Sequence, residues 1–159
     1  MKMKQVFIAS LALVLFVPAV LAAGGDDPSA PVRQFIDAFN AGNVQAAFAT
    51  YANGSVTIVD EFPPHIWTGT DAARHWADAY DKHALASGVT DGKVTYSKPT
   101  RIEVDGEVAY VILPTKYLYK EYGNALQEEG QMTAVLNRQA GAWKIRSWTW
   151  SGVKPHTAN

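Results

Sequence analysis

The chain has 159 residues, of which 48% are hydrophobic and 18% are charged, and its formal net charge is −1. This composition is typical of one globular domain and excludes a disordered or fibrous chain. A weakly acidic chain without basic runs is a poor candidate for binding nucleic acid or an anionic membrane surface, and the absence of cysteine excludes disulfides, thiolate metal ligands and a cysteine nucleophile.

The first 23 residues have the pattern of a secretory signal peptide. Lys2 and Lys4 form a basic start, residues 6–17 are a nearly unbroken apolar run, and residues 20–22 are a small-residue cleavage pattern. The apolar run is shorter than a membrane span requires. We therefore expect export to the periplasm or the exterior with no membrane contact after cleavage. A flexible leader at residues 24–30, one domain at residues 31–153 and a tail at residues 154–159 would follow.

Three helices are expected in the first part of the domain. Pro31 can open the first helix because its missing N–H costs nothing in the first turn. Apolar residues follow it at helical spacing, namely Val32, Phe35, Ile36 and Phe39. The same spacing predicts a short second helix through Val44, Phe48 and Tyr51.

Residues 70–86 fit the third helix. Thr70 is a plausible N-cap, and Gly88 suits the position after the helix end. The expected buried stripe consists of Ala73, Trp76, Ala77 and Tyr80.

Strands joined by tight turns account for the rest of the domain. One strand is expected at residues 55–59, between the second and third helices. Later strands turn at Asp105-Gly106, near Gly123-Asn124 and near Ala140-Gly141. Helices followed by an antiparallel meander predict an α+β fold in which the helices lie on one face of the sheet.

One predicted strand indicates that both faces of the sheet are covered. Alternate residues from Ala109 to Tyr119 are largely apolar, and so are those from Tyr110 to Leu118 on the other face. Because three helices cover only one face, we expect a strongly curved sheet and a homodimer that covers the other. Pro114 cannot donate to the ladder, so we expect it at a bulge or bend.

Four stretches resemble the nuclear-transport-factor-2-like superfamily, which includes SnoaL-like polyketide cyclases and ketosteroid isomerases. They are F-I-x-x-F-N-A-G-N at residues 35–43, TYANGSV at residues 50–56, W-x-G-x-x-A-A at residues 67–73 and GAWKIRSWTWS at residues 141–151. The resemblance spans residues 31–153. It implies a cone, in which three helices pack on a strongly curved antiparallel sheet (a cystatin-like arrangement), with an apolar pocket at the wide end. The fold hosts unrelated activities, so the resemblance says little about function.

The resemblance also implies a candidate base. In members similar to ketosteroid isomerase, a carboxylate at the end of the first strand is the general base, and Asp60 occupies that place. That chemistry also uses an oxyanion hole made of a tyrosine and a protonated aspartate. The matching positions here are Phe35 and either Met132 or Thr133. Because both donors are missing where the family has them, we do not expect steroid isomerase activity.

Asp60, Glu61 and His65 are the candidate acid–base residues. Asp60 and Glu61 are adjacent, so on a strand their side chains point in opposite directions and one of them faces the pocket. Burial among aromatic rings would raise the pKa of that carboxyl, whereas a strand-end carboxylate in water would be ordinary. Because histidine titrates near neutrality, His65 is a candidate acid or orienting partner for Asp60. The alternative is an exposed loop histidine.

Aromatic side chains are the candidates for the pocket wall. Rings with hydroxyl or indole groups suit a planar apolar ligand better than a charged one, although aromatic residues also fill small cores. The predicted ligand-binding residues are Phe35, Phe39, Trp67, Trp76, Tyr80, Tyr117, Tyr119 and Trp150. The histidines lack metal-ligand spacing and the chain has no dinucleotide or phosphate motif, so we predict neither a metal nor a cofactor.

Three functions remain open from the sequence, and the third is an envelope interaction protein whose cone is filled by aromatic side chains. The first is an exported SnoaL-like protein that binds a small apolar or cyclic molecule and performs cofactor-free isomerase, cyclase or dehydratase chemistry with Asp60 and His65. The second is a non-catalytic module that uses the cone for ligand binding or dimerisation. The carboxylate in the base position favours the first, and the missing oxyanion donors favour the second.

Overall fold

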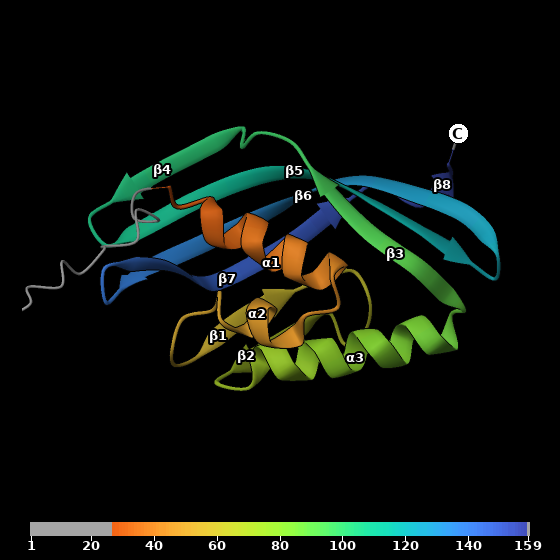
Figure 1. Ribbon diagram of the computed structural model, residues 1–159, viewed down its shortest axis with the longest axis horizontal. Helices are drawn as coiled ribbons and strands as arrows, with labels where there is room; N and C mark the ends of the chain where they lie inside the picture. Colours follow the sequence, from red (N-terminus) through yellow and green to blue (C-terminus); the bar gives the residue numbers. More distant parts are fainter. Residues whose placement is uncertain (1–26, 159) are drawn as a thin grey trace, which may run out of the picture.

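The computed structural model describes residues 27–158, in which the helices lie against one face of a strongly curved sheet (Figure 1). This arrangement confirms the predicted α+β fold. The helices are α1 (Ala30–Asn40), α2 (Val44–Phe48) and α3 (Ala72–Ala86). The strands are β1 (Val56–Val59), β2 (Ile66–Gly69), β3 (Val89–Tyr96), β4 (Arg101–Asp105), β5 (Val108–Glu121), β6 (Asn124–Gln139), β7 (Ala142–Gly152) and β8 (His156–Thr157).

The strands form one sheet in the order β2-β1-β7-β6-β5-β3, in which β4 also pairs with β5 and β8 with β6. Strands β4 to β7 form successive antiparallel hairpins, as the turn signals predict. β1 pairs with β7 in parallel orientation, so the sheet is mixed rather than wholly antiparallel. Turn signals could not reveal this pair, because β1 and β7 lie far apart in the chain. The short strand β2, which forms a hairpin with β1, was also outside the predicted set.

Pro114 lies where two strands share one edge of β5. β4 pairs with β5 up to Ile112, and β3 pairs with it from Thr115 onward. Ser97, in the connection between β3 and β4, donates its N–H to the Pro114 carbonyl at 3.1 Å. The missing N–H of Pro114 therefore faces a gap between partner strands. On the other edge Pro114 pairs with Gln131 in unbroken register, so of the expected bulge or bend the structure contains no bulge between β5 and β6, and Pro114 instead marks the break between β3 and β4.

The inner face of the sheet, which faces the helices, is aliphatic at one end. Its largest fully buried side chains are 0% exposed, as is Val32 of α1, and belong to Ile58, Val111, Leu113, Leu136 and Ile145. We call this region the closed end. A register shift between Val135 and Leu136 lets both Ile145 and Trp148 of β7 face inward, although three positions separate them. Burial of this apolar surface is the main stabilising contribution to the fold.

Helix α1 is tied to the edge strand β3 by one side chain. The Asn40 amide donates to the Val94 carbonyl at 2.7 Å, and its oxygen accepts the Val94 N–H at 2.8 Å. Asn40 thus satisfies a pair of backbone groups that no neighbouring strand reaches. This contact holds the end of α1 against the sheet beside the pocket described below.

Three local features refine the predicted elements. The N-cap of α3 is Asp71 rather than Thr70, and its side chain makes no capping hydrogen bond. Helix α2 ends at Phe48 and does not continue to Tyr51. Gly88 follows α3 with a φ of +62°, which agrees with the prediction that this position favours glycine.

Both ends of the described chain take part in the fold. Asp27 accepts hydrogen bonds from the Ser29 backbone and hydroxyl and forms an ion pair with Arg33 at 2.8 Å. Part of the predicted leader therefore contacts α1, and β8, in the predicted tail, pairs with β6. The predicted signal peptide lies outside the described residues. Within residues 27–158, every helix is too short or too polar to cross a membrane.

Candidate functional site

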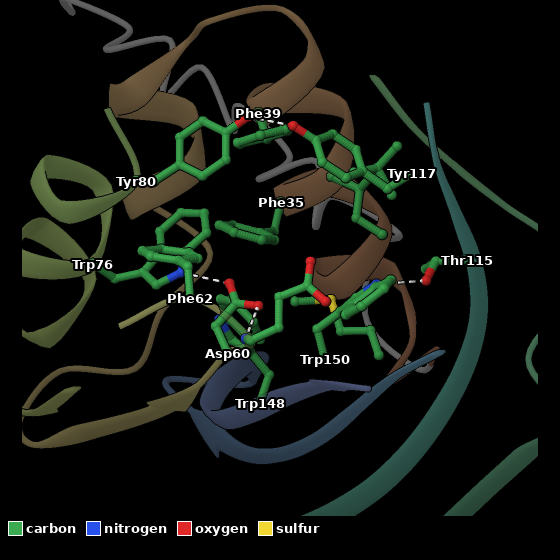
Figure 2. Close-up of a pocket in the computed structure, with 14 residues that line it drawn as sticks. Phe35, Phe39, Asp60, Phe62, Trp76, Tyr80, Thr115, Tyr117, Trp148 and Trp150 are labelled. Atoms are coloured by element: carbon green, nitrogen blue, oxygen red, sulfur yellow. Dashed lines mark hydrogen bonds between the residues drawn. The ribbon is translucent and has the colours of Figure 1, made fainter. Parts of the chain in front are cut away.

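A pocket opens between helices α1 and α3 and the inner face of the sheet (Figure 2). It has a volume of about 80 Å³ and lies at the end of the sheet opposite the closed end. Its wall consists of Phe35, Ile36, Phe39, Asp60, Glu61, Phe62, Trp76, Tyr80, Val94, Thr115, Tyr117, Met132, Trp148 and Trp150. The predicted residues that line it are Phe35, Phe39, Asp60, Trp76, Tyr80, Tyr117 and Trp150.

The helices supply two pairs of aromatic rings. Phe35 and Phe39 are four residues apart on α1, and Trp76 and Tyr80 are four residues apart on α3, so each pair shares one helix face. The Phe39 and Tyr80 rings meet edge to face with centroids 5.2 Å apart, and Trp76 stacks on Tyr80 at 5.9 Å. These contacts make the helical side of the pocket a continuous aromatic wall.

Two glycines make room for Trp150 on the sheet side. A Cβ at Gly130 would lie 2.5 Å from the Trp150 ring, and one at Gly152 would lie 2.4 Å from it. The Trp150 indole N–H donates to the Thr115 hydroxyl at 2.9 Å. The ring is therefore held in one position in the pocket wall.

Asp60 is the carboxylate at the base of the pocket. The Trp76 indole N–H donates to its Oδ2 at 2.8 Å, and the Glu61 backbone N–H donates to its Oδ1 at 2.8 Å (Figure 2). Burial raises the pKa of Asp60 above its usual value and the nearby charge of Glu128 adds to the rise, whereas the two hydrogen bonds and the charge of His83 lower this pKa. Asp60 is thus a carboxylate that is partly desolvated yet held in a defined orientation.

Glu61 also lines the pocket, contrary to the expectation that only one of the two adjacent carboxylates faces it. The alternation of a strand stops at Val59, where β1 ends, so it does not govern Asp60 and Glu61. The residue as a whole is exposed, but its carboxyl is desolvated beside Glu128. This burial, a hydrogen bond with Glu128 and the charges of Glu128 and Asp60 raise the pKa of Glu61 to about 8.

A pair of tyrosine hydroxyls lies across the pocket from Asp60 (Figure 2). The hydroxyl oxygens of Tyr80 and Tyr117 are 2.7 Å apart, so one donates to the other and one proton is left for a ligand. Burial raises the pKa of both tyrosines above the usual value, which keeps the hydroxyls protonated. These donors come from α3 and β5, whereas the resemblance places oxyanion donors at Phe35 and Met132 or Thr133.

Tyr119 does not line the pocket, although the sequence predicts it as a ligand contact. Its ring stacks behind Tyr117 with centroids 4.6 Å apart, and its hydroxyl donates to Glu128 Oε1 at 2.7 Å. Glu128 is 2% exposed, and sequence reasoning missed it. A signal was available, because Glu128 shares the alternation of the buried residues Met132 and Ala134 on the inner face of β6.

Trp67 and His65 lie away from the pocket wall. Trp67 is 7% exposed and packs behind Phe62, with ring centroids 5.1 Å apart, so it supports the wall from outside. His65 is exposed; its Nδ1 lies 3.2 Å from the Asp60 carbonyl oxygen, and its own carbonyl accepts the Asp60 N–H at 3.0 Å. His65 thus contacts the Asp60 backbone. The histidine whose charge reaches the Asp60 carboxyl is His83, which stacks on Phe62 at 5.1 Å.

The polar groups of the site suit proton transfer and hydrogen bonding. Within residues 27–158, no group of three or more histidine, aspartate or glutamate side chains is arranged to hold a metal ion. The pocket combines two carboxyls and three hydroxyls with a mostly apolar lining. Such a lining orients an apolar ligand and strengthens its few polar contacts.

The family profile of the SnoaL-like domain matches residues 29–154, and the chain belongs to this family. A solved ketosteroid isomerase-like protein from Erwinia carotovora atroseptica is 20% identical with a TM-score of 0.62, over 80% of this chain and 94% of that one. Hexachlorocyclohexane dehydrochlorinase LinA-type3 from Novosphingobium barchaimii is 12% identical with a TM-score of 0.67, over 80% of this chain and 85% of that one. These likenesses confirm the nuclear-transport-factor-2-like fold. A search of curated proteins found no match.

Proposed function

We propose that the protein binds a small apolar, cyclic molecule in the pocket and performs cofactor-free acid–base chemistry on it, with Asp60 as the general base. One observation carries the proposal. The Asp60 carboxyl is oriented by two N–H donors in the wall of an aromatic pocket that raises its pKa. A base with a raised pKa binds a proton more strongly and works closer to neutral pH, which is what a proton-abstracting residue requires.

The Tyr80–Tyr117 pair would stabilise the charge that develops when a proton leaves the ligand. Its hydroxyls are 2.7 Å apart and lie across the pocket from Asp60. Donors aimed at developing charge in a water-poor site are an effective source of rate acceleration. We propose His65 as the orienting partner of Asp60, because it contacts the backbone of Asp60 through two polar contacts.

The size of the pocket supports a ligand with one small ring. Pockets for drug-sized ligands have volumes of roughly 300–1,000 Å³, whereas this pocket has about 80 Å³. A larger molecule would have to protrude from the mouth. The isomerase and dehydrochlorinase named among the structural relatives are consistent with cofactor-free removal of a proton, although their likeness to this chain concerns the fold alone.

The second candidate function is non-catalytic binding of the same class of ligand. It is favoured by Phe35, which replaces the hydroxyl that the isomerase resemblance places on α1. We further propose that the protein is exported and forms a homodimer through the outer face of the sheet. The outer residues of β5, namely Tyr110, Ile112, Pro114, Lys116 and Leu118, are half-buried in the single chain.

The test is hydrogen exchange into small ring-bearing ketones. Cyclohexanone, cyclopentanone and acetophenone are incubated with the protein in deuterium oxide, and loss of the proton next to the carbonyl is followed by NMR. We expect catalysed exchange with at least one ketone and its loss in Asp60→Asn, while the same ketone still binds. Asp37→Asn is the matched control, because Asp37 on α1 bonds the exposed Tyr96 hydroxyl outside the pocket.

Each outcome of this experiment separates the two candidate functions. Binding without exchange by the wild type would reject catalysis on these ketones and favour the non-catalytic module. Exchange that persists in Asp60→Asn would remove Asp60 as the base. A wild type that binds none of the ketones would contradict the proposed ligand class.

A further inference from the structure

Glu128 is a buried carboxyl group for which the proposed chemistry has no role. It lies on the inner face of β6 and is 2% exposed. Its Oε1 accepts the Tyr119 hydroxyl at 2.7 Å. Its Oε2 is buried and has no hydrogen-bond partner among the residues that the structure describes. A buried charged oxygen without a donor costs considerable free energy, so its presence needs a cause.

A second carboxyl group beside Glu128 accounts for this buried oxygen without a donor. The Glu61 side chain lies within hydrogen-bonding range of Glu128. Two ionised carboxylates are both acceptors, so they can form this bond only if one of them holds a proton. Repulsion between two negative charges at this distance favours the same state, in which the pair carries one proton and one charge.

We propose that Glu61 and Glu128 share one proton at neutral pH while the pocket is empty, and that Glu61 turns this proton from Glu128 toward a bound ligand and becomes its hydrogen-bond donor. Glu61 lines the pocket and would touch the ligand, whereas Glu128 lies behind it. Glu128 is therefore a positioning residue, which Tyr119 holds in place. The donor role rests on the proposed function of the pocket as a ligand site.

The groups around the pair come from four elements or loops of the fold. Asp60 precedes Glu61 in the chain, Glu128 is on β6 and Tyr119 is on β5. The charges of Glu128 and Asp60, together with burial, raise the pKa of Glu61 to about 8. Burial and the bond to Glu128 raise the pKa of Tyr119, so it stays a donor. His83 on α3 acts on Asp60 and lowers the pKa of that carboxyl.

This arrangement narrows the class of ligand. A protonated Glu61 next to an ionised Asp60 offers one donor and one base within the same wall of the pocket. The matching ligand has an acceptor oxygen on an apolar ring and an acidic C–H nearby, as in a cyclic or aryl ketone. An anionic ligand would be repelled by Asp60 and by the charge on the Glu61–Glu128 pair. Glu61 would thus supply a donor that the family positions lack.

The first experiment tests the pair without any ligand. The side-chain carboxyl carbons of the six glutamates are labelled with ¹³C and titrated by NMR. We expect the Glu61 resonance, assigned by its loss in Glu61→Gln, to titrate near the value of about 8. Glu128→Gln keeps an acceptor for Tyr119 and adds an amide donor, so it should lower this midpoint by roughly 2 pH units. Glu129→Gln is the matched control, because Glu129 pairs with exposed Lys116 at 3.2 Å.

A Glu61 that titrates in the ordinary range of about 4 to 5 would overturn the proposal. So would a Glu61 midpoint that does not respond to Glu128→Gln, or one that responds equally to Glu129→Gln.

The second experiment tests the donor role with acetophenone labelled at its carbonyl carbon. The ¹³C shift of the bound ketone reports hydrogen bonding to its oxygen. We expect a hydrogen-bonded shift at about pH 6.5 that decreases at about pH 9.5, as Glu61 ionises, to the shift that the Tyr80–Tyr117 pair alone would give. Glu61→Gln should retain a shift that does not change with pH, and Glu61→Leu should show the smaller shift at both pH values.

The outcomes separate this inference from the proposed function. Wild-type protein that binds acetophenone with the same shift at both pH values would overturn the donor role. Absence of binding at either pH would contradict the proposed ligand class and, with it, the donor role, while the titration would still decide whether the two carboxyls share a proton.

Discussion

The inner face of β5 and β6 differs between its two ends. At the closed end, Ala109 and Val111 lie opposite Leu136 and Ala134, and all four are 0–1% exposed; beside them, Leu113 lies opposite Met132, which borders the pocket. At the pocket end, the same alternation places Thr115, Tyr117 and Tyr119 opposite Gly130, Glu128 and Leu126. The pairing of β5 with β6 continues in one register through both ends. The difference therefore lies in the side chains alone.

The two ends of this face contribute differently: the closed end stabilises the fold, and the pocket end carries the functional groups. Aliphatic side chains at the closed end need only close packing, which stabilises the fold without directional contacts. Each polar group at the pocket end needs a partner, because an unpaired polar group there is costly. Packing at the closed end stabilises the fold, and the fold keeps the carboxyls and hydroxyls of the pocket end away from water. This desolvation shifts their pKa values.

The largest expected effect is at the closed end. Leu113→Ala should lower the free energy of unfolding by about 2–5 kcal/mol, because it removes a fully buried side chain and leaves a cavity. The measurement is urea unfolding of the purified protein. Leu118→Ala, on the outer face of the same strand, is the control and should cost less. Equal losses would mean that a second chain covers the outer face.

A smaller effect is expected in the pH dependence of stability. The pKa of Glu61 rises from 4.5 to about 8 on folding, so the folded chain binds more protons between these values. The contribution of this group to stability is therefore full below pH 4.5 and is lost as pH rises to about 8. Urea unfolding between these pH values should show a shallower decline in Glu61→Gln than in the wild type. An unchanged slope would mean that the carboxyl is not desolvated in solution.

Two hydrogen bonds from a tyrosine to a carboxylate, one buried and one exposed, allow a matched test of how burial affects their contribution to stability. The Tyr119 hydroxyl donates to buried Glu128, whereas the Tyr96 hydroxyl donates to exposed Asp37 at 3.1 Å. Tyr119→Phe should cost about 1–3 kcal/mol of unfolding free energy, because it leaves a buried carboxylate oxygen without its donor. Tyr96→Phe should cost less than about 0.5 kcal/mol, as is usual at an exposed site. Similar costs would contradict the contrast between the buried and the exposed site.

The smallest expected effect concerns the environment of Asp60. Trp76→Phe removes the indole N–H that lowers the pKa of Asp60, so this pKa should rise further, by about one pH unit. Titration of ¹³C-labelled aspartate carboxyls by NMR measures the change. Trp148→Phe is the control, because the Trp148 indole donates to the Tyr51 hydroxyl at 2.7 Å rather than to a carboxyl. A lowered pKa in Trp76→Phe would exclude the indole as the donor that holds Asp60.

Much of the fold could be predicted because its signals are local. Helical spacing in α1, the Ala140-Gly141 turn and the glycine after α3 each depend on a few adjacent residues. Alternation predicted how the residues of β5 divide between two faces, and the structure shows which of the two is the buried one. The same local logic failed at Glu61, because the strand ends one residue before Asp60 and the alternation with it.

The sequence by itself determined the α+β class, the family resemblance, the aromatic character of the pocket and the candidate position of Asp60. The tertiary structure decided which distant groups meet: β1 with β7, Tyr80 with Tyr117, and Glu61 with Glu128. The physical reason is that local patterns set the direction of a side chain relative to its own element. Its partner depends on the register and packing of elements that are far apart in the chain.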